Sequence, residues 1–315
     1  MKWPIVALLV CLGAGTLQAA ELTSIGVSVA DLGNPFFVQI AESIADKARE
    51  MAGDQVNVVV RSSAYDLDRQ RRQIQEFIRM QVDLIVLTAA DSVNIEKDVR
   101  RAQKAGIRVI AVDINAAGAD ATITTDNVQA GEIACEYLAR RLGGKGDVVI
   151  INGAAISSVI DRVAGCKAVL EKYPEIHLLS DQLNGGGTIE GGLEVMTYLI
   201  NAHGRIDGVF AINDPSAQGA VMAARQADRR DFIITSVDGA PVARKALTQS
   251  DRPWVATAAQ FPRQMAELAV TTGLSLLRGK PLASRIILIP AQLITAANIG
   301  QYVGWGEHPP VEKQP

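Results

Sequence analysis

The sequence predicts an α/β fold made of two lobes of similar design. Three observations support this: strands alternate with helices, the alternation occurs twice, and polar residues directly follow several strands. Successive strands lie about 24 to 32 residues apart, which accommodates one strand, one helix and two short loops. Such alternation is typical of a parallel sheet with helices on both faces, so two arrays indicate two such lobes.

Runs of β-branched and other apolar residues mark the strands of each array. They predict strands at 24–30, 56–61, 83–88 and 107–112, then at 147–151, 176–180, 207–212 and 232–237. Helical patterns lie between them, such as Asp66 to Gln81, where Leu67, Ile74 and Phe77 share one apolar stripe.

The two arrays are expected to meet near Thr122 to Asn127. After the second array come a strand at Val255–Ala259, a helix over Pro262–Arg278 and a strand at Ile286–Ile289. The residues after Trp305 are polar and rich in proline, which predicts a frayed tail.

Composition narrows the function. The 315 residues carry a net charge of −3 and only 4% aromatics, so no basic surface favours nucleic acid. The histidines, His177, His203 and His308, are scattered and show no metal-ligand spacing. Gly-x-Ser-x-Gly and Walker motifs are missing from the sequence. We therefore expect neither an enzyme nor a cofactor or metal.

The first twenty residues have the layout of a secretory signal peptide. Lys2 gives a positive start, Ile5 to Leu12 is almost wholly apolar, and Ala19-Ala20 ends the segment. The alternative is a retained N-terminal membrane anchor. Residues 1–20 thus predict a protein outside the cytoplasm, and the resemblance described below implies the periplasm.

Two cysteines, Cys135 and Cys166, follow the leader. Both lie on predicted helices that one strand separates, so the two side chains could be neighbours. In an oxidising compartment such a pair permits one disulfide. The alternative is two buried, small apolar residues. The sequence leaves both interpretations open.

Polar and aromatic residues follow the strands, where open parallel sheets bind ligands. Each alone could be a helix cap, a surface residue or a core residue. Together, carboxylates, amides, one arginine and aromatic rings suit the hydroxyls and the apolar face of a sugar or polyol. The candidates are Asn34, Phe36, Phe37, Asp113, Arg162 at the head of a helix, Asn213, Asp238 and Gln260.

These residues carry a resemblance. Asn34-Pro35-Phe36-Phe37, Val112-Asp113, Phe210 to Asp214, Val237-Asp238-Gly239 and Ala256 to Gln260 match, in order and spacing, the ribose-binding family of periplasmic proteins. The resemblance covers about Leu22 to Pro290 and implies that the eight candidates contact the ligand. It also implies two Rossmann-like lobes, each a parallel sheet flanked by helices, joined by three hinge crossovers.

The crossovers implied by the resemblance fall near 126, 260 and 290. The first lobe would then comprise 21–126 and 261–289, the second lobe 127–260 and 290–305, and the tail 306–315. The family's role implies a monomer that delivers its solute to an ABC permease in the inner membrane. The alternative is a sensing subunit that hands a signal to a chemoreceptor or sensor kinase.

The sequence departs from ribose binders at three places. Ile114 replaces an arginine, the run Gly185-Gly186-Gly187 replaces a stacking aromatic, and Ala30 replaces a serine. A charge-assisted hydrogen bond contributes roughly 1.5–3 kcal/mol and aromatic stacking roughly 0.5–1.5 kcal/mol. We therefore expect a solute other than ribose: a different sugar, a polyol or a small non-sugar. Sugar-responsive repressors, which share this core, are not expected, because the first strand begins directly after the leader.

Overall fold

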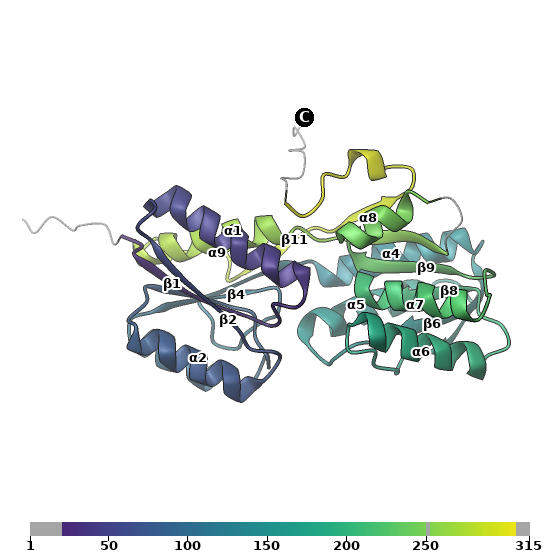
Figure 1. The fold of residues 1–315 in the computed structure, drawn as a ribbon, viewed down its shortest axis with the longest axis horizontal. Coiled ribbons are helices and arrows are strands. Elements are labelled where there is room, and N and C mark those ends of the chain that lie inside the picture. Colours follow the sequence, from purple (N-terminus) through teal and green to yellow (C-terminus); the bar gives the residue numbers. More distant parts are fainter. Residues whose placement is uncertain (1–20, 250–252, 307–315) are drawn as a thin grey trace, which may run out of the picture.

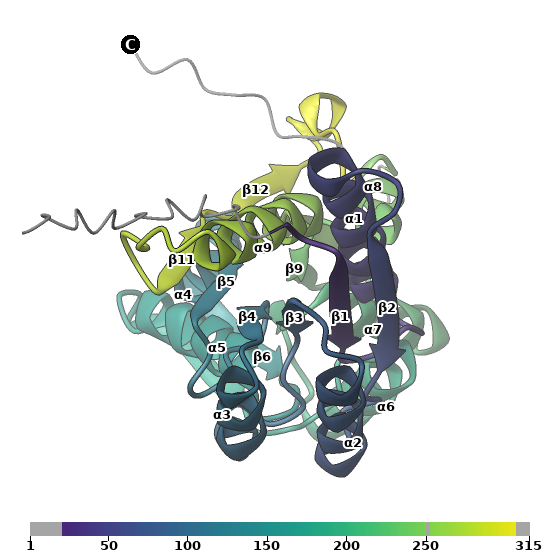
Figure 2. The ribbon, with the colours of Figure 1, turned by 90° about the vertical axis from the view of Figure 1, so that its left-hand side faces the viewer.

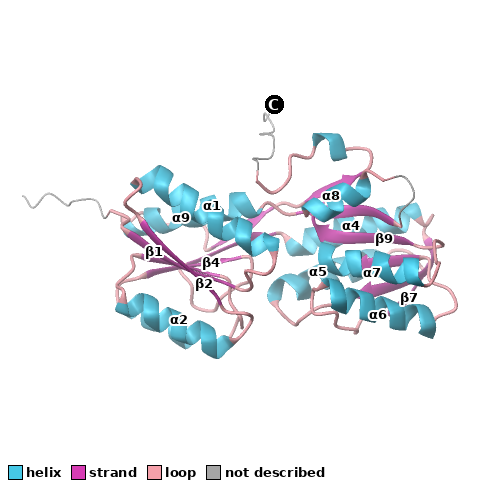
Figure 3. Cartoon of the chain, viewed as in Figure 1, coloured by secondary structure: helices cyan, strands magenta, loops and turns pink. Residues whose placement is uncertain are grey.

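The computed structural model describes residues 21–249 and 253–306, which form two α/β lobes lying side by side (Figure 1). The predicted signal peptide and residues 307–315 of the predicted tail lie outside the described residues. Within these ranges, no helix is both long and apolar enough to cross a bilayer. Both lobes alternate strands with helices (Figure 3), which confirms the predicted fold class.

The first lobe contains a six-stranded, fully parallel sheet. Helices α1 (Pro35–Ala52) and α9 (Pro262–Leu277) cover one face, and α2 (Leu67–Arg79) and α3 (Glu96–Lys104) cover the other (Figure 2). In spatial order the strands are β11 (Ile286–Ile289), β5 (Ala121–Thr125), β4 (Arg108–Val112), β3 (Leu84–Leu87), β1 (Ser24–Val29) and β2 (Asn57–Ser62).

The central strand β3 shows why these residues form a buried strand. Leu84 and Val86 belong to the core under α1 and α9, whereas Ile85 and Leu87 belong to the core under α2 and α3. A strand covered by helices on both faces must be apolar at every position, and β3 is.

The second lobe repeats this design. Helices α4 (Asn127–Arg141) and α5 (Ser157–Leu170) cover one face, and α6 (Ile189–Ala202) and α7 (Asp214–Gln226) the other, while α8 (Pro241–Leu247) follows β9. In spatial order the strands are β12 (Gln292–Thr295), β10 (Trp254–Ala259), β9 (Ile233–Asp238), β8 (Gly208–Ala211), β6 (Lys145–Ile151) and β7 (Glu175–Ser180). A short 3₁₀ helix, η1 (Ile299–Gln301), follows β12.

Within the described ranges, the chain passes between the two sheets at three places. It leaves the first sheet after β5, returns after β10, and leaves again between β11 and β12. Gln129 of α4 stabilises the last passage, since its Oε1 accepts from the Ala291 amide at 2.7 Å.

Two strands were missed by the sequence patterns. The segment Ala121–Thr125, expected to be part of the junction, is the strand β5, which pairs with β4 and β11. Its three threonines hide the apolar run that marks the other strands. Strand β12 is antiparallel to β10, so the second sheet is not wholly parallel as expected.

Candidate site between the lobes

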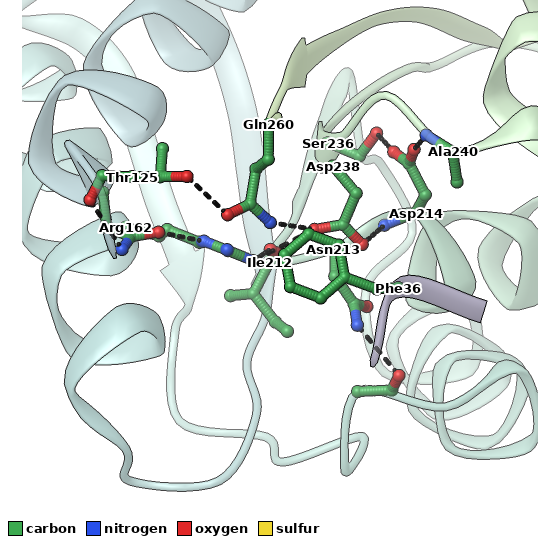
Figure 4. A network of polar contacts seen from close by, with 12 residues as sticks. Phe36, Thr125, Arg162, Ile212, Asn213, Asp214, Ser236, Asp238, Ala240 and Gln260 are labelled. Atoms are coloured by element: carbon green, nitrogen blue, oxygen red, sulfur yellow. Dashed lines mark hydrogen bonds and ion pairs between the residues drawn. The ribbon is translucent and has the colours of Figure 1, made fainter. Parts of the chain in front are cut away.

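A cavity of about 340 Å³ lies between the lobes, at the carboxyl ends of the strands. Its volume falls within the range of small-molecule sites, about 300–1,000 Å³. The structure brings all eight candidate residues to its wall: Asn34, Phe36, Phe37, Asp113, Arg162, Asn213, Asp238 and Gln260. Side chains from strands far apart in the sequence therefore converge on one space, several of them shown in Figure 4.

The first lobe contributes aromatic rings. Asn34 caps α1, and its Oδ1 accepts from the Phe36 amide at 3.0 Å, so the cap interpretation holds for this oxygen. The cap directs the start of α1 to the cavity, where Phe36 and Phe37 pack edge to face at 5.4 Å. Tyr65 extends the aromatic surface, with its ring 6.4 Å from that of Phe37.

Asp113 is the first lobe's only ionisable candidate. It follows β4 with φ at +66°, a left-handed conformation that non-glycine residues rarely adopt. The Asp113 amide donates to the Ile123 carbonyl at 2.9 Å, and its carbonyl accepts from Thr124 Oγ1 at 2.7 Å, which holds this backbone in place.

The Asp113 carboxyl is buried, and its Oδ1 has no hydrogen-bond partner among the described residues. Burial raises the pKa of Asp113 to about 7, against the opposing charge of Arg162 and with a further contribution from Asp238. A buried oxygen without a partner costs free energy, which a hydroxyl donor on a ligand would recover.

The second lobe contributes a connected polar network (Figure 4). Arg162 Nη1 donates to the Ile212 carbonyl at 3.0 Å and lies 3.4 Å from Asp238 Oδ1. The same Asp238 oxygen accepts from Gln260 Nε2 at 2.7 Å. Gln260 Oε1 in turn accepts from Thr125 Oγ1 of the first lobe at 2.7 Å. Burial raises the pKa of Asp238, although Arg162 and Gln260 favour its ionised form.

Arg162 lies in the second turn of α5, not at the head of the helix as predicted. Close packing of α4 and α5 places it there, because a Cβ at Gly131 would collide with the Arg162 carbonyl oxygen. Arg162 Nε donates to Asn127 Oδ1 at 2.8 Å. A disulfide joins Cys135 of α4 to Cys166 of α5, one turn beyond the arginine.

Two of the amide candidates are already engaged within the protein. Asn213 caps α7 through Oδ1, which accepts from the Ser216 amide at 3.0 Å, and its Nδ2 donates to the Gly187 carbonyl at 2.9 Å. Gln260 uses both ends of its amide, as described above. Their main contribution is therefore to position the groups around them.

Behind the cavity, Asp214 stabilises the strand ends. Its Oδ1 accepts from Ser236 Oγ and Thr257 Oγ1 at 2.6 and 2.7 Å, and its Oδ2 from the Ala240 amide at 2.6 Å. Asp214 is fully buried, and burial raises its pKa well above the usual range. It is a structural carboxylate that does not line the cavity.

Of the departures from ribose binders, one lies away from the cavity and another lies in its wall. Ile114 is fully buried in the core under α2 and α3 and does not line the cavity. Gly186 and Gly187 do line it, with φ of +63° and +71°. The wall therefore has no side chain at the place where ribose binders are expected to carry a stacking aromatic ring.

The sequence patterns missed Tyr65 and Asn127. Tyr65 lies three residues beyond β2, so the rule that located the other strand-end residues could have found it. Asn127 directly follows the first crossover, but only tertiary structure brings its side chain to Arg162. Within residues 21–249 and 253–306, no group of three or more His, Cys, Asp or Glu could hold a metal ion.

Comparison with known proteins identifies the family. The model of the periplasmic binding protein domain matches residues 25–281, and the chain belongs to this family.

Individual relatives agree with this assignment. A D-apiose import binding protein from Paraburkholderia graminis is 32% identical over 297 residues, covering 91% of each chain. A ribose import binding protein from Bacillus subtilis is 29% identical over 281 residues, covering 86% of this chain and 87% of the relative. The crystal structure of an ABC transporter solute binding protein from Mycobacterium smegmatis with bound glycerol is 26% identical. It superposes with a TM-score of 0.82, covering 90% of this chain and 98% of that chain.

Proposed function

We propose that this chain is the periplasmic solute-binding component of an ABC importer and holds an uncharged sugar or polyol between its lobes. The arrangement of Asp113, Arg162 and Asp238 around one cavity carries this proposal. Carboxylates accept from ligand hydroxyls and the guanidinium donates to them, while Phe36 and Phe37 cover apolar C–H surface. Relatives named for D-apiose and ribose, and one with bound glycerol, support hydroxyl-rich ligands.

The proposed ligand contacts are the eight residues that the sequence singled out, joined by Tyr65. Asn213 and Gln260 act mainly by positioning, because their amide groups bond within the protein. No chemical step is assigned to the site: the chain binds and releases its solute unchanged. Residues 1–20 act as the signal peptide, and the binding protein works as a monomer that docks on an inner-membrane permease. Docking on a chemoreceptor or sensor kinase stays a prediction of the sequence.

The proposed mechanism is a hinge motion. Residues 21–126 with 261–289 move against 127–260 with 290–305, and ligand stabilises the closed form because both lobes contact it. The lobes already touch where the Asn115 amide donates to Ser157 Oγ at 3.2 Å. Opening of the cleft breaks this contact and admits the solute.

A thermal-shift screen tests the proposal. The panel contains D-ribose, D-apiose, D-allose, L-arabinose, xylitol, myo-inositol and glycerol, with small amino acids as non-sugar controls. A ligand at 100 times its Kd stabilises the folded state by about 2.7 kcal/mol, which raises Tm measurably. At least one sugar or polyol is expected to raise Tm, and calorimetry should then show one site. A response to amino acids alone would overturn the proposed ligand class.

A further inference from the structure

The last described residues return to the junction of the two lobes. After η1, residues Tyr302–Gly306, here called the C-terminal strap, pass between the start of α1 and the start of α8 (Figure 1). The strap was expected to belong to the second lobe up to Trp305 and to be tail beyond it. Tyr302 and Trp305 are buried in a core cluster that contains residues of both lobes, among them Phe36 of α1 and Ala259 of β10.

Trp305 contacts both sides of the cavity at once. Its ring packs edge to face on Phe36 of the first lobe, with centroids 5.5 Å apart. Its Nε1 donates to the backbone carbonyl of Asp238 in the second lobe at 2.7 Å. Phe36 and Asp238 both line the cavity, from opposite lobes. One indole therefore contacts two proposed ligand contacts, one from each lobe.

Two further hydrogen bonds anchor the strap, one on each lobe. Tyr302 donates its hydroxyl to the Gly239 carbonyl of the second lobe at 2.7 Å. At the other end, Arg263 of α9 in the first lobe donates through Nη1 to the Gly306 carbonyl at 2.8 Å. The three anchors make a path from one lobe to the other that is separate from the three crossovers.

The anchor on Asp238 bears directly on the site. Asp238 has a φ of +133°, far outside the common region for residues other than glycine. Backbone in such a conformation persists only where its surroundings hold it. Trp305 and Tyr302 bond the consecutive carbonyls of Asp238 and Gly239, the turn that presents the Asp238 carboxyl to the cavity.

We propose that the C-terminal strap is a fourth connection across the hinge, with Trp305 as a positioning residue that couples Phe36 to Asp238. The strap limits how far the lobes open and holds the Asp238 turn for the ligand. The effect on affinity rests on the proposed ligand class, and the limit on opening rests on the proposed hinge motion alone.

A matched pair of variants separates this role from simple core packing. Trp305→Phe keeps an aromatic ring but removes the N–H that bonds the Asp238 carbonyl. Trp254→Phe makes the same change at an indole that is also buried, and whose Nε1 bonds Ser236 Oγ at 2.9 Å, all within the second lobe. Tyr302→Phe removes a second hydrogen-bond donor of the strap, the Tyr302 hydroxyl. It replaces Trp305→Phe in the comparison if that variant folds poorly.

Small-angle X-ray scattering without ligand is the first measurement. Trp305→Phe and Tyr302→Phe are expected to show a larger radius of gyration than the unchanged protein, because their lobes open further. Trp254→Phe is expected to match the unchanged protein. Equal radii for all four proteins, with circular dichroism showing each of them to be folded, would overturn the proposed role of the strap.

Calorimetry with D-apiose, D-allose, xylitol and myo-inositol as probes is the second measurement. Loss of one hydrogen bond should weaken the affinity for a bound probe roughly 2- to 12-fold in Trp305→Phe, and less than about 2-fold in Trp254→Phe. Equal affinities in both variants would refute the coupling of Trp305 to the site. If the unchanged protein binds no probe, the proposed function fails, and the scattering result alone decides the strap.

Discussion

The two faces of the cavity differ in how completely their polar groups are satisfied. On the second-lobe face, Arg162 and Asp238 belong to one hydrogen-bonded network that extends to Gln260. On the first-lobe face, Phe36, Phe37 and Tyr65 are joined by a single carboxylate, Asp113, whose Oδ1 has no partner among the described residues.

This difference assigns a separate task to each lobe. The second-lobe network is held before a ligand arrives, so little ordering cost remains on binding. The first lobe provides apolar cover and one carboxylate oxygen, Asp113 Oδ1, that no described protein group bonds. We therefore expect the second lobe to determine whether a solute binds and the first lobe to determine which solute is favoured. Substitutions on the two faces of the cavity test this division.

Loss of either charge in the second-lobe network is expected to cause the largest loss of affinity. Arg162→Ala removes the guanidinium and leaves Asp238 buried without a cation, and Asp238→Ala does the reverse. Each change should weaken affinity by more than about 150-fold, because removing one partner of a buried ion pair costs about 3–5 kcal/mol and the hydrogen bonds to the ligand are lost as well. Calorimetry with the strongest binder of the panel measures the effect.

Arg100→Ala is the control for these variants, since Arg100 is an exposed arginine paired with Glu96 in the first lobe. It should bind as tightly as the unchanged protein. Unchanged affinity in both Arg162→Ala and Asp238→Ala would remove the site assignment.

Asp113→Asn is expected to weaken binding roughly 10- to 150-fold, the equivalent of one charged hydrogen bond. Asparagine retains the shape but presents a neutral oxygen to the ligand. This loss should be smaller than that of Arg162→Ala, because Asp113 does not hold other cavity residues in place through its carboxyl. An equal or larger loss would contradict the proposed division between the lobes.

The same variant should gain stability when empty, in a pH-dependent way. Burial raises the pKa of Asp113 to about 7 in the folded chain, against about 3.9 when unfolded. The folded protein is therefore most stable below about pH 4, where the Asp113 carboxyl is protonated, and it loses stability as the pH rises towards 7. By pH 8 the loss in the free energy of unfolding is on the order of 4 kcal/mol. Asparagine does not ionise, so Asp113→Asn avoids this loss.

Melting temperatures of both empty proteins from pH 5 to 8 measure this effect. The advantage of Asp113→Asn should grow with pH and level off above about pH 7. A constant difference across the range would show that the Asp113 carboxyl does not titrate there.

Tyr65→Ala is expected to weaken binding roughly 2- to 13-fold, the equivalent of one aromatic contact of about 0.5–1.5 kcal/mol. Tyr65→Phe should retain most of the affinity, because the ring remains. Competition calorimetry with a panel of sugars would show whether selectivity also changes. Tyr198→Ala, at an exposed tyrosine of α6, is the control. If Tyr65→Ala binds every sugar as the unchanged protein does, the ring is not a ligand contact.

Replacement of Cys135 and Cys166 by serine is expected to change affinity least. The disulfide closes a separation of 31 residues, so its removal should lower the free energy of unfolding by roughly 3–4 kcal/mol. Affinity should change by less than about 2-fold, because Asn127 and the Ile212 carbonyl still hold Arg162. Urea denaturation and calorimetry provide the two values. An affinity loss as large as that of Arg162→Ala would show that the disulfide, and not this bonding, positions the arginine.

Much of the fold could be predicted because buried parallel strands need continuous apolar runs, as in Leu84–Leu87. Strand β5 lacked that signal because its threonines have polar side chains. Their hydroxyls are used: Thr124 bonds the Asp113 carbonyl and Thr125 bonds Gln260. The sequence pattern contains nothing that reports such tertiary hydrogen bonds.

The site, like the fold, could be predicted only in part. Residues that follow strand ends could be predicted from the topology of parallel sheets, and the cavity collects them together with Arg162 of α5. Asn127 and Trp305 could not be predicted, since helix packing and the return of the chain after β12 bring them to the site. The engagement of Asn213 and Gln260 within the protein was equally hidden, because a residue's type does not reveal its partners.

The central claim is that two lobes close on one hydroxyl-rich solute. Small-angle X-ray scattering of the unchanged protein, with and without a saturating amount of the strongest binder in the panel, tests it most directly. The account predicts that the radius of gyration falls when the solute binds. An unchanged profile, with calorimetry confirming that the site is full, would contradict it.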